Sequence, residues 1–336
     1  MRYKMIPSFI AKPVLFLSIS AIFFGTVFCD SSKNSHRAKK ENKVAIESKK
    51  SVDKSSNEKK KKYVTDDPSL SLTYEEIMEV VNKAESGSYE IYSVKVGLTQ
   101  KAKRKLFIKK GENTDRIPVV FSFQVLKSDE RIVLVDTGFV SEKMKLKWKV
   151  VDYRDPAQGL SALGIAPGQV SDIVITHRHW DHVGGLSLFP KANVWMAKSE
   201  YDTALKKFQS KYPVIFNGLK SAETDERMKW TKRLEEILPG IVVVRQGLHT
   251  RNFQYVVVKN KSGIWVLASD VGGLYENFEG PTSSGQTLNP QGSVQALRNI
   301  QGLVENDLSR VVPSHDPLVF EKYLQIKPGI VKITGD

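Results

Sequence analysis

One six-residue string restricts the fold of this chain more than any other feature of its sequence: His177-Arg178-His179-Trp180-Asp181-His182. It directly follows the apolar segment Asp172 to Thr176, which has the composition of a buried strand. Imidazole and carboxylate groups are the ligands that a borderline cation such as zinc prefers. Four such groups within six positions are more than one ion can use. The string therefore predicts a loop at the end of a strand that serves two neighbouring metal ions, with accidental clustering of histidines as the alternative.

The charge of the chain is distributed unevenly. Its 336 residues are 40% hydrophobic and 26% charged, as in an ordinary globular protein with one large domain or two small ones. The net charge of +14 would suggest nucleic acid as a partner. Residues 1–29 contribute +3 and residues 30–63 contribute +7, which leaves only +4 for residues 64–336. We therefore expect a small-molecule substrate and no nucleic-acid partner for the part that carries the histidines.

Residues 1–29 are arranged like an export signal. Three basic side chains precede an apolar run from Val14 to Phe28, and the run ends at Cys29, the only cysteine of the chain. A cysteine in this place resembles a bacterial lipoprotein signal, in which the thiol is acylated. The fifteen apolar residues are short for a bilayer span, which needs about 20, so a transmembrane helix is the alternative. We expect a protein that is exported to the cell envelope or periplasm and held at a membrane through Cys29.

The segment that follows, residues 30–65, is rich in Lys, Ser, Asn and Glu and has few aliphatic side chains. Such a segment cannot bury enough apolar surface to offset the entropy lost on ordering. The composition therefore predicts a disordered tether over residues 30–65 and a catalytic domain over residues 66–336.

In this domain the hydrophobic pattern predicts strands with helices placed unevenly between them. Thr73 and Glu76 form a capping-box pattern at the start of a short helix. The predicted strands are Tyr89–Leu98, Val119–Leu126, Arg131–Val135, Asp172–Thr176, Ile241–Arg245, Phe253–Lys259, Gly263–Ser269 and Arg310–Pro313. The other predicted helices are Lys198–Lys211, Lys229–Leu238 and Ser293–Glu305. This order indicates a mixed α/β layered domain.

The histidine string resembles the signature of the metallo-β-lactamase superfamily, because it is followed by Val183-Gly184-Gly185 and preceded by Val135-Asp136-Thr137-Gly138. The resemblance covers the chain from about Tyr89 to Pro317. It implies a four-layer αββα sandwich, with the metal site at one edge of the two packed sheets.

Three further residues complete the ligand set that the resemblance implies. His249 lies between two predicted strands, where the family places the third histidine of its first metal. Asp270 ends a predicted strand, where the family has a carboxylate shared by both ions, and His315 follows the last predicted strand, where the second metal takes its last ligand. By resemblance, one ion is bound by His177, His179 and His249, the other by Asp181, His182 and His315, and Asp270 bridges them.

The same groups suggest a mechanism. Two divalent ions that share a water lower its pKa from about 15.7 to about 7, which supplies a bridging hydroxide at neutral pH. Asp181 is expected to accept a proton and pass it to the leaving oxygen. Tyr275 follows Asp270 by five residues, and the resemblance to the lactonase branch implies that its hydroxyl donates to a substrate carbonyl, with packing as the alternative. Zinc is the expected metal, although iron, manganese and cobalt also suit these ligands.

Several other side chains have two open interpretations. Asp136 either orients a ligating imidazole or is the carboxylate of a turn. Trp180 either lines the substrate pocket or packs in the core. A groove for an apolar acyl chain would be lined by Phe107, Trp148 and Phe278.

Within the superfamily, the spacings most resemble those of the N-acyl-homoserine lactone hydrolases, with 21 residues from His249 to Asp270 and 45 from Asp270 to His315. True β-lactamases lack a carboxylate in the place of Asp270. We therefore expect a dinuclear metal-dependent hydrolase that acts on a lactone or a related ester. The alternatives are another hydrolase of this fold, acting on a phosphotriester, thioester or β-lactam, or a non-catalytic surface lipoprotein with a degraded metal site.

Overall fold

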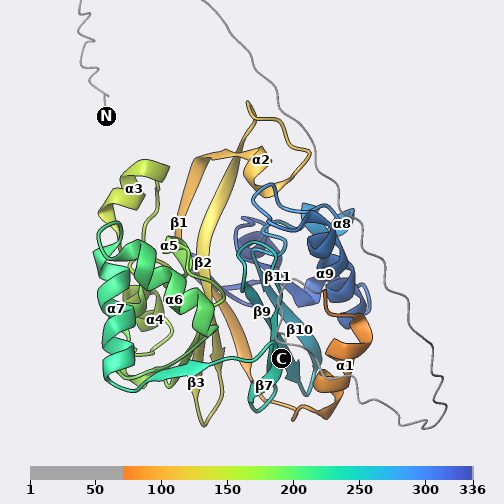
Figure 1. Cartoon of the computed structure of the whole chain (residues 1–336), viewed down its shortest axis with the longest axis horizontal. Coiled ribbons are helices and arrows are strands. Elements are labelled where there is room, and N and C mark those ends of the chain that lie inside the picture. Colours follow the sequence, from red (N-terminus) through yellow and green to blue (C-terminus); the bar gives the residue numbers. More distant parts are fainter. Residues whose placement is uncertain (1–70, 335–336) are drawn as a thin grey trace, which may run out of the picture. The chain divides into compact units, whose positions relative to one another are not determined.

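The structure is a computed structural model, and it describes residues 71–334. The predicted signal segment at residues 1–29 and the tether at residues 30–65 lie outside the described residues and remain predictions, as does the domain start at residue 66. Between residues 71 and 334 the chain forms two β-sheets that pack face to face between two layers of helices (Figure 1). This is the predicted αββα sandwich.

The larger sheet has eight strands. In spatial order they are β12 (Leu324–Lys327), β13 (Ile330–Lys332), β1 (Glu90–Lys103), β2 (Arg116–Lys127), β3 (Ile132–Val135), β4 (Asp172–Val174), β5 (Asn193–Met196) and β6 (Met228–Trp230). The strands from β12 to β3 pair in antiparallel fashion, whereas β3, β4, β5 and β6 are parallel. The carboxyl ends of β3 and β4 therefore lie at the same edge of this sheet.

The smaller sheet has five strands. In spatial order they are β11 (Val311–Pro313), β10 (Gly263–Ser269), β9 (Gln254–Asn260), β8 (Ile241–Arg245) and β7 (Leu234–Leu238). Only β10 and β11 are parallel, so these two strands also end at a common edge.

Helices cover the outer face of each sheet (Figure 1). The larger sheet is accompanied by α3 (Glu142–Trp148), α4 (Pro156–Ser161), α5 (Trp180–Val183), α6 (Lys198–Phe208) and α7 (Pro213–Thr224). The smaller sheet is accompanied by α1 (Tyr74–Lys83), α8 (Glu276–Glu279) and α9 (Pro290–Leu303). Two short helices, α2 (Arg104–Phe107) and α10 (Val319–Lys322), follow β1 and β11.

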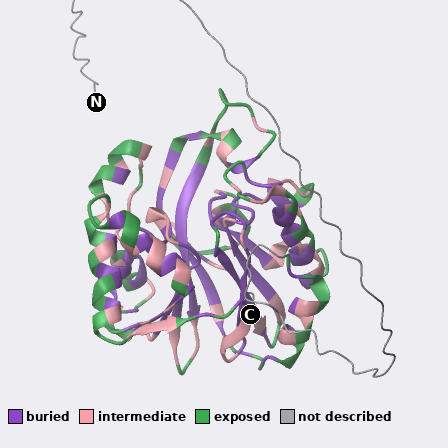
Figure 2. Cartoon of the chain, viewed as in Figure 1, coloured by how far each residue is buried: buried purple, intermediate pink, exposed green. Residues whose placement is uncertain are grey.

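Alternation along the strands builds the core. Val133 and Val135 of β3 pack between the two sheets, whereas Leu134 packs under the helices of the larger sheet. Successive side chains of a strand point to opposite faces, so a strand covered on both sides is apolar throughout. Figure 2 shows the result, with buried residues along the strands and exposed residues on the outer helices and loops.

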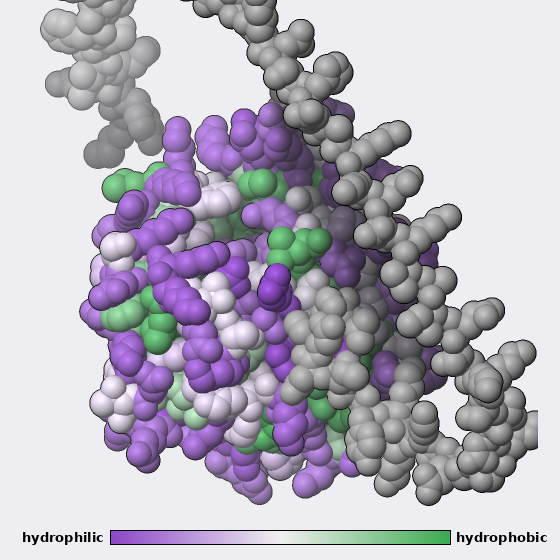
Figure 3. Space-filling view, in the orientation of Figure 1, coloured by the Kyte–Doolittle hydropathy of each residue, from purple (hydrophilic) through white to green (hydrophobic). Residues whose placement is uncertain are grey.

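The surface of the described part carries only scattered apolar side chains. The face drawn in Figure 3 is mostly hydrophilic, with small separate hydrophobic patches. The exposed large side chains include Leu146 on α3, Leu288 in the loop before α9, and Leu324 on β12. Among the helices of residues 71–334, none has the length and apolar character that a bilayer span requires.

The predicted helix Lys229–Leu238 is wrong. Leu234, Ile237 and Leu238 recur at helical spacing, but the segment forms β6 and β7, which pair with β5 and β8 at the edges of the two sheets. Pairing with a neighbouring strand outweighed the local spacing. The helix of this region is α7 instead, and it begins with Pro213 in its first turn.

The other predicted strands and helices are present. The predicted capping box of Thr73 and Glu76 is present at α1, where the Thr73 hydroxyl accepts from the Glu76 N–H and the Glu76 carboxylate accepts from the Thr73 N–H. Strand β1 runs to Lys103, five residues beyond the predicted end at Leu98. Strands β5, β12 and β13 and helices α3 and α4 were not predicted; the three strands are only three or four residues long.

Candidate metal centre

Seven side chains that lie far apart in the sequence meet at one edge of the two sheets. Their ligand atoms form two groups, and within each group these atoms lie within 4.8 Å of one another. The groups are His177, His179, His249 and Asp270, and Asp181, His182 and His315. The structure thus brings together every residue that the sequence predicted as a metal ligand, with the predicted division between two positions.

The fold explains why these residues meet. The loop from His177 to His182 leaves the carboxyl end of β4, and the short helix α5 turns Asp181 and His182 toward the same space. Asp270 directly follows β10, and His315 follows β11 by two residues. Because β10 and β11 are parallel, both side chains are placed at one end of the smaller sheet. Ligands are often placed at such carboxyl ends in α/β folds.

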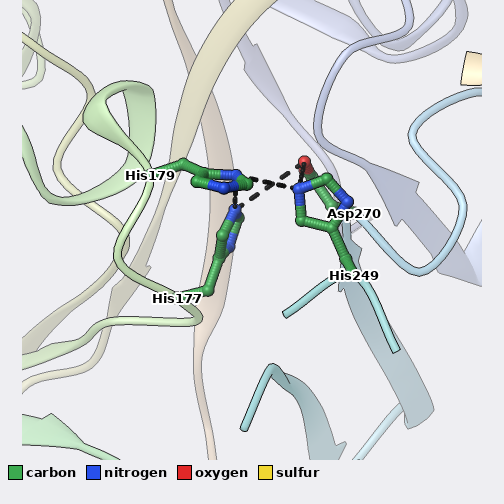
Figure 4. Close-up of side chains that lie close together, drawn as sticks. All are labelled: His177, His179, His249 and Asp270. Atoms are coloured by element: carbon green, nitrogen blue, oxygen red, sulfur yellow. Dashed lines mark hydrogen bonds and ion pairs between the residues drawn. The ribbon is translucent and has the colours of Figure 1, made fainter. Parts of the chain in front are cut away.

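In the first group three ring nitrogens face one another (Figure 4). The Nδ1 atom of His179 lies 2.9 Å from Nε2 of His177 and 2.9 Å from Nε2 of His249. A neutral imidazole has one donor and one acceptor nitrogen, so three nitrogens in contact cannot all be satisfied by hydrogen bonds among themselves. A cation between them would satisfy all three.

Asp270 presents one carboxylate oxygen to each group. Its Oδ2 atom lies 3.2 Å from Nε2 of His249 and 3.8 Å from Nε2 of His177. Its Oδ1 atom lies 3.1 Å from Nε2 of His315 and 3.3 Å from Nε2 of His182. One carboxylate is therefore in place to be shared by two ions.

The second group contains a buried nitrogen that lacks a hydrogen bond. His182 is 1% exposed, and its Nε2 atom makes no hydrogen bond with any atom of residues 71–334. The same atom lies 3.8 Å from Oδ2 of Asp181, which lies 3.9 Å from Nε2 of His315. A buried polar atom without a partner is costly, and a metal ion bound here would supply the missing partner. The residues present thus fit a pair of divalent cations.

Neighbouring groups fix the orientation of three of these imidazoles. Nδ1 of His182 donates to Oδ2 of Asp136 at 2.7 Å, and Nδ1 of His315 donates to the Val120 carbonyl at 2.9 Å. The Thr176 hydroxyl donates to Oδ2 of Asp136 at 2.9 Å and accepts from Nδ1 of His177 at 3.0 Å. With the proton held on Nδ1, each Nε2 offers its lone pair to the site. Asp136 therefore orients ligand candidates, as one of its two interpretations predicted.

The backbone is strained on both sides of the site. Asp136 has a φ of 63° and Ser269 a φ of 48°, in the left-handed region that non-glycine residues rarely adopt. Asp136 directly follows β3 and binds the His182 ring, and Ser269 ends β10 directly before Asp270. Such strain is commonly found where a functional site fixes the chain.

Burial keeps the histidines of the first group neutral. Desolvation lowers the pKa of His177 and His179 well below the usual value, and it also lowers the pKa of His249. The neighbouring histidines add to this effect because they disfavour a second positive charge. Neutral imidazoles are the form that binds metal ions.

Negative charge governs the second group. Burial lowers the pKa of His182 and His315, but Asp270 and the other carboxylates outweigh it and raise both pKa values above the usual one. Burial also opposes ionisation of Asp270, but His315, His182 and His249 outweigh it and hold its pKa well below the usual range. Burial raises the pKa of Asp181, partly opposed by His182.

A cavity of about 320 Å³ opens beside the two groups, and five of the seven ligand candidates line it. Trp180, Phe107 and Trp148 line it as well, which confirms the predictions for Phe107 and Trp148. Trp180 also packs on the core ring of Phe139, so both of its interpretations hold. The prediction for Phe278 is wrong, because its ring is fully buried in the core under α9.

The structure does not bring the Tyr275 hydroxyl to this cavity. The hydroxyl donates to the Val311 carbonyl at 3.0 Å and lies 3.1 Å from the hydroxyl of Tyr323. The backbone N–H of Tyr275 donates to Asp316 at 2.8 Å, which fixes the segment after Asp270 in this direction. The packing interpretation of Tyr275 therefore replaces its predicted role as a donor to the substrate.

Sequence reasoning missed several residues around the site. Glu200 on α6 is bound to Arg178, and Phe121 on β2 lines the cavity. Lys207 and Lys211, at and just after the end of α6, also line it. The helical pattern of α6 located these two lysines on a helix end, but no local signal in the sequence indicates that this end faces the metal ligands.

A family model described as the metallo-beta-lactamase superfamily matches residues 122–315. The matched range is more than half of the chain and contains all seven ligand candidates.

Relatives and solved structures agree with this match. The chain is 22% identical to an N-acyl homoserine lactonase of Bacillus thuringiensis over 223 residues, which cover 62% of this chain and 85% of the relative. It is similar to a solved N-acyl homoserine lactone hydrolase with the product N-hexanoyl-L-homoserine bound at its catalytic metal centre (TM-score 0.60, 16% identity, covering 73% of this chain and 100% of that one). A dizinc quorum-quenching lactonase in complex with a product has a TM-score of 0.55 at 18% identity, covering 75% of this chain and 96% of that one. At these identities the structural likeness shows a shared fold.

Proposed function

Since the chain belongs to the metallo-β-lactamase superfamily and is a metal-dependent hydrolase, we propose that it opens a lactone or cleaves a related carboxylic ester at a pair of zinc ions. One observation carries the proposal, namely that Asp270 presents a separate oxygen to each of the two ligand groups. The similarity to N-acyl homoserine lactonases supports the choice of a lactone. The non-catalytic alternative is set aside, because no ligand position is degraded.

The residues have distinct roles in this proposal. His177, His179 and His249 would hold one ion, Asp181, His182 and His315 the other, and Asp270 both. When bound, the ions supply an activated water at neutral pH and polarise the carbonyl group of the substrate.

Asp181 is the proton carrier in this proposal. Its carboxylate lines the cavity beside the ligand groups, within reach of a bound substrate. It takes the proton of the attacking water and returns it to the leaving oxygen of the ester.

The test uses the purified protein and a matched pair of variants. Metal analysis should give about two ions per chain, and lactones should be turned over faster than phosphotriesters or thioesters of similar size. Asp270→Asn keeps the volume of the side chain but removes its charge, so it should lose metal and activity. Asp129→Asn lies in an exposed turn after β2 and should keep both. Full activity of the Asp270→Asn variant, or faster turnover of phosphotriesters than of lactones, would overturn the proposal.

We also propose that the protein is exported and anchored through Cys29, a proposal supported only by the composition of residues 1–65. Labelling of the expressed protein with radioactive palmitate tests it. The intact chain should be labelled and a Cys29→Ala variant should not.

A further inference from the structure

We propose that the substrate of this site carries a negatively charged group, such as a carboxylate, in addition to the ester or lactone bond and an apolar portion. This inference rests on the proposed function and names a class within it. It is drawn from the lining of the cavity beside the metal ligands, which combines aromatic rings with cations that have no partner of opposite charge.

The apolar part of the lining comes from α2, β2, α3 and α5. Phe107 and Phe121 meet the ring of His315 edge-on, with centroids 5.4 and 5.9 Å away. Trp148 stacks on Trp180 at 6.2 Å. These four rings lie directly beside the second ligand group. They offer a surface for an apolar or aromatic part of the molecule that contains the scissile bond.

The charged part of the lining comes from the end of α6 and the turn that follows. Lys207 and Lys211 are exposed, and neither forms an ion pair with any residue from 71 to 334. Between and after them, Phe208 and Tyr212 also line the cavity, and the Lys211 ammonium lies 5.3 Å from the centre of the Tyr212 ring. Two exposed lysines thus line the cavity without an anionic partner among residues 71–334.

The other charges of the lining do not balance these lysines. Arg178 also lines the cavity, but its Nη1 atom is bound to both oxygens of the buried Glu200, at 2.7 and 2.6 Å. The only carboxylates of the lining are Asp181 and Asp270, and both are candidate ligands whose charge two divalent cations would more than balance. The loaded cavity is therefore positive, and an anionic group would be attracted to Lys207 and Lys211.

A structural alternative is that these lysines are ordinary solvated side chains of a helix end. Lys206 provides the comparison, because it is also an exposed lysine on the same turn of α6 but is not part of the cavity lining. A role in substrate binding should affect Lys207 and Lys211 and leave Lys206 without effect.

The experiment compares two esters with the metal-loaded full chain. They are the 4-nitrophenyl monoester of glutaric acid and 4-nitrophenyl pentanoate, whose acyl chains have the same number of carbon atoms and differ in a terminal carboxylate. The wild type should have the higher kcat/KM with the glutarate ester. Lys207→Gln and Lys211→Gln should each lower the ratio of the two kcat/KM values by a factor of about 2 to 5. High salt should lower this ratio as well, and Lys206→Gln should leave it unchanged.

A binding measurement separates this inference from the proposed reaction. Calorimetry with glutaric acid monoanilide and with pentananilide, amide analogues of the two esters, reports the charge preference even if neither ester is cleaved. Tighter binding of the glutarate analogue that depends on Lys207 and Lys211 would support an anionic ligand, and absence of ester cleavage would then count only against the reaction. Equal binding of the two analogues, or equal effects of Lys206→Gln and Lys207→Gln, would overturn the inference.

Discussion

The carboxylate of Glu200 binds the guanidinium group of Arg178, the residue between the first two histidines of the site, at 2.7 and 2.6 Å. Glu200 also accepts from the backbone N–H of Asn252 at 3.2 Å, three residues after His249. One buried side chain of α6 therefore connects the loop of the larger sheet that carries His177 and His179 with the loop of the smaller sheet that carries His249.

Replacing Glu200 by Gln should loosen this connection. The substitution leaves Arg178 as a partly buried charge without an anionic partner, and breaking such a pair costs about 3 kcal/mol or more of the free energy of unfolding. Denaturation in urea measures this loss, and metal titration should show weaker binding at the first position. Glu75→Gln, an exposed position on α1, is the control. Stability equal to that of the control would show that the connection contributes nothing.

Asp136→Asn should weaken metal binding without unfolding the domain. Asn tolerates the left-handed backbone of this position, so the substitution mainly removes the charge that accepts from Nδ1 of His182. Loss of such an orienting acceptor typically lowers metal affinity by about 10- to 100-fold. Competition with a chromophoric chelator measures the affinity, and circular dichroism measures the fold. Unchanged affinity would exclude an orienting role for Asp136.

Metal uptake should release protons near neutral pH. In the metal-free protein Asp270 and its neighbours outweigh the effect of burial and raise the pKa of His182 and His315 above the usual value of 6.5, so these rings hold protons at a pH where free histidine has lost them. A metal ion must displace these protons, and its affinity should therefore rise with pH above about 6.5. Calorimetric titrations with zinc in two buffers of different ionisation enthalpy should give different observed enthalpies. Identical enthalpies would contradict the raised pKa values.

Gly185→Ala should destabilise the domain. A Cβ atom at Gly185 would lie within 2.3 Å of the Thr137 carbonyl oxygen, which is backbone and cannot rotate away. The segment with Thr137, after β3, and the segment with Gly185, after α5, would have to move apart. This movement should lower the free energy of unfolding by about 1 to 3 kcal/mol. Gly280→Ala is the control, because no atom lies within 4 Å of a Cβ there. Thermal melting of the two variants gives the comparison, and equal melting temperatures would refute the steric argument.

The parts of the site that follow directly from local sequence were predictable. The string from His177 to His182, and the ends of the strands that carry Asp270 and His315, are local signals, and the family resemblance related them to one another. Tyr275 was misassigned because its direction depends on a bond between its backbone and Asp316, about 40 residues later.

Contacts between distant segments account for the other failures. Nothing near Glu200 in the sequence indicates that it binds Arg178. The segment Lys229–Leu238 has helical spacing, and only its pairing with β5 and β8 makes it two strands. Local sequence patterns therefore failed at the sheet edges and at contacts between loops, where segments far apart in the sequence decide the structure.

The ligand candidates are divided between loops of the two sheets, and this division has a consequence for fragments of the chain. The loop after β4 brings four of them, and the loops after β8, β10 and β11 bring the other three, His249, Asp270 and His315. Neither half of the polypeptide, produced as a separate fragment, contains a complete coordination sphere. Bound metal would link the two sheets, because each ion takes ligands from both. Two fragments mixed in solution should therefore associate more tightly when zinc is added, and a chelator should dissociate them.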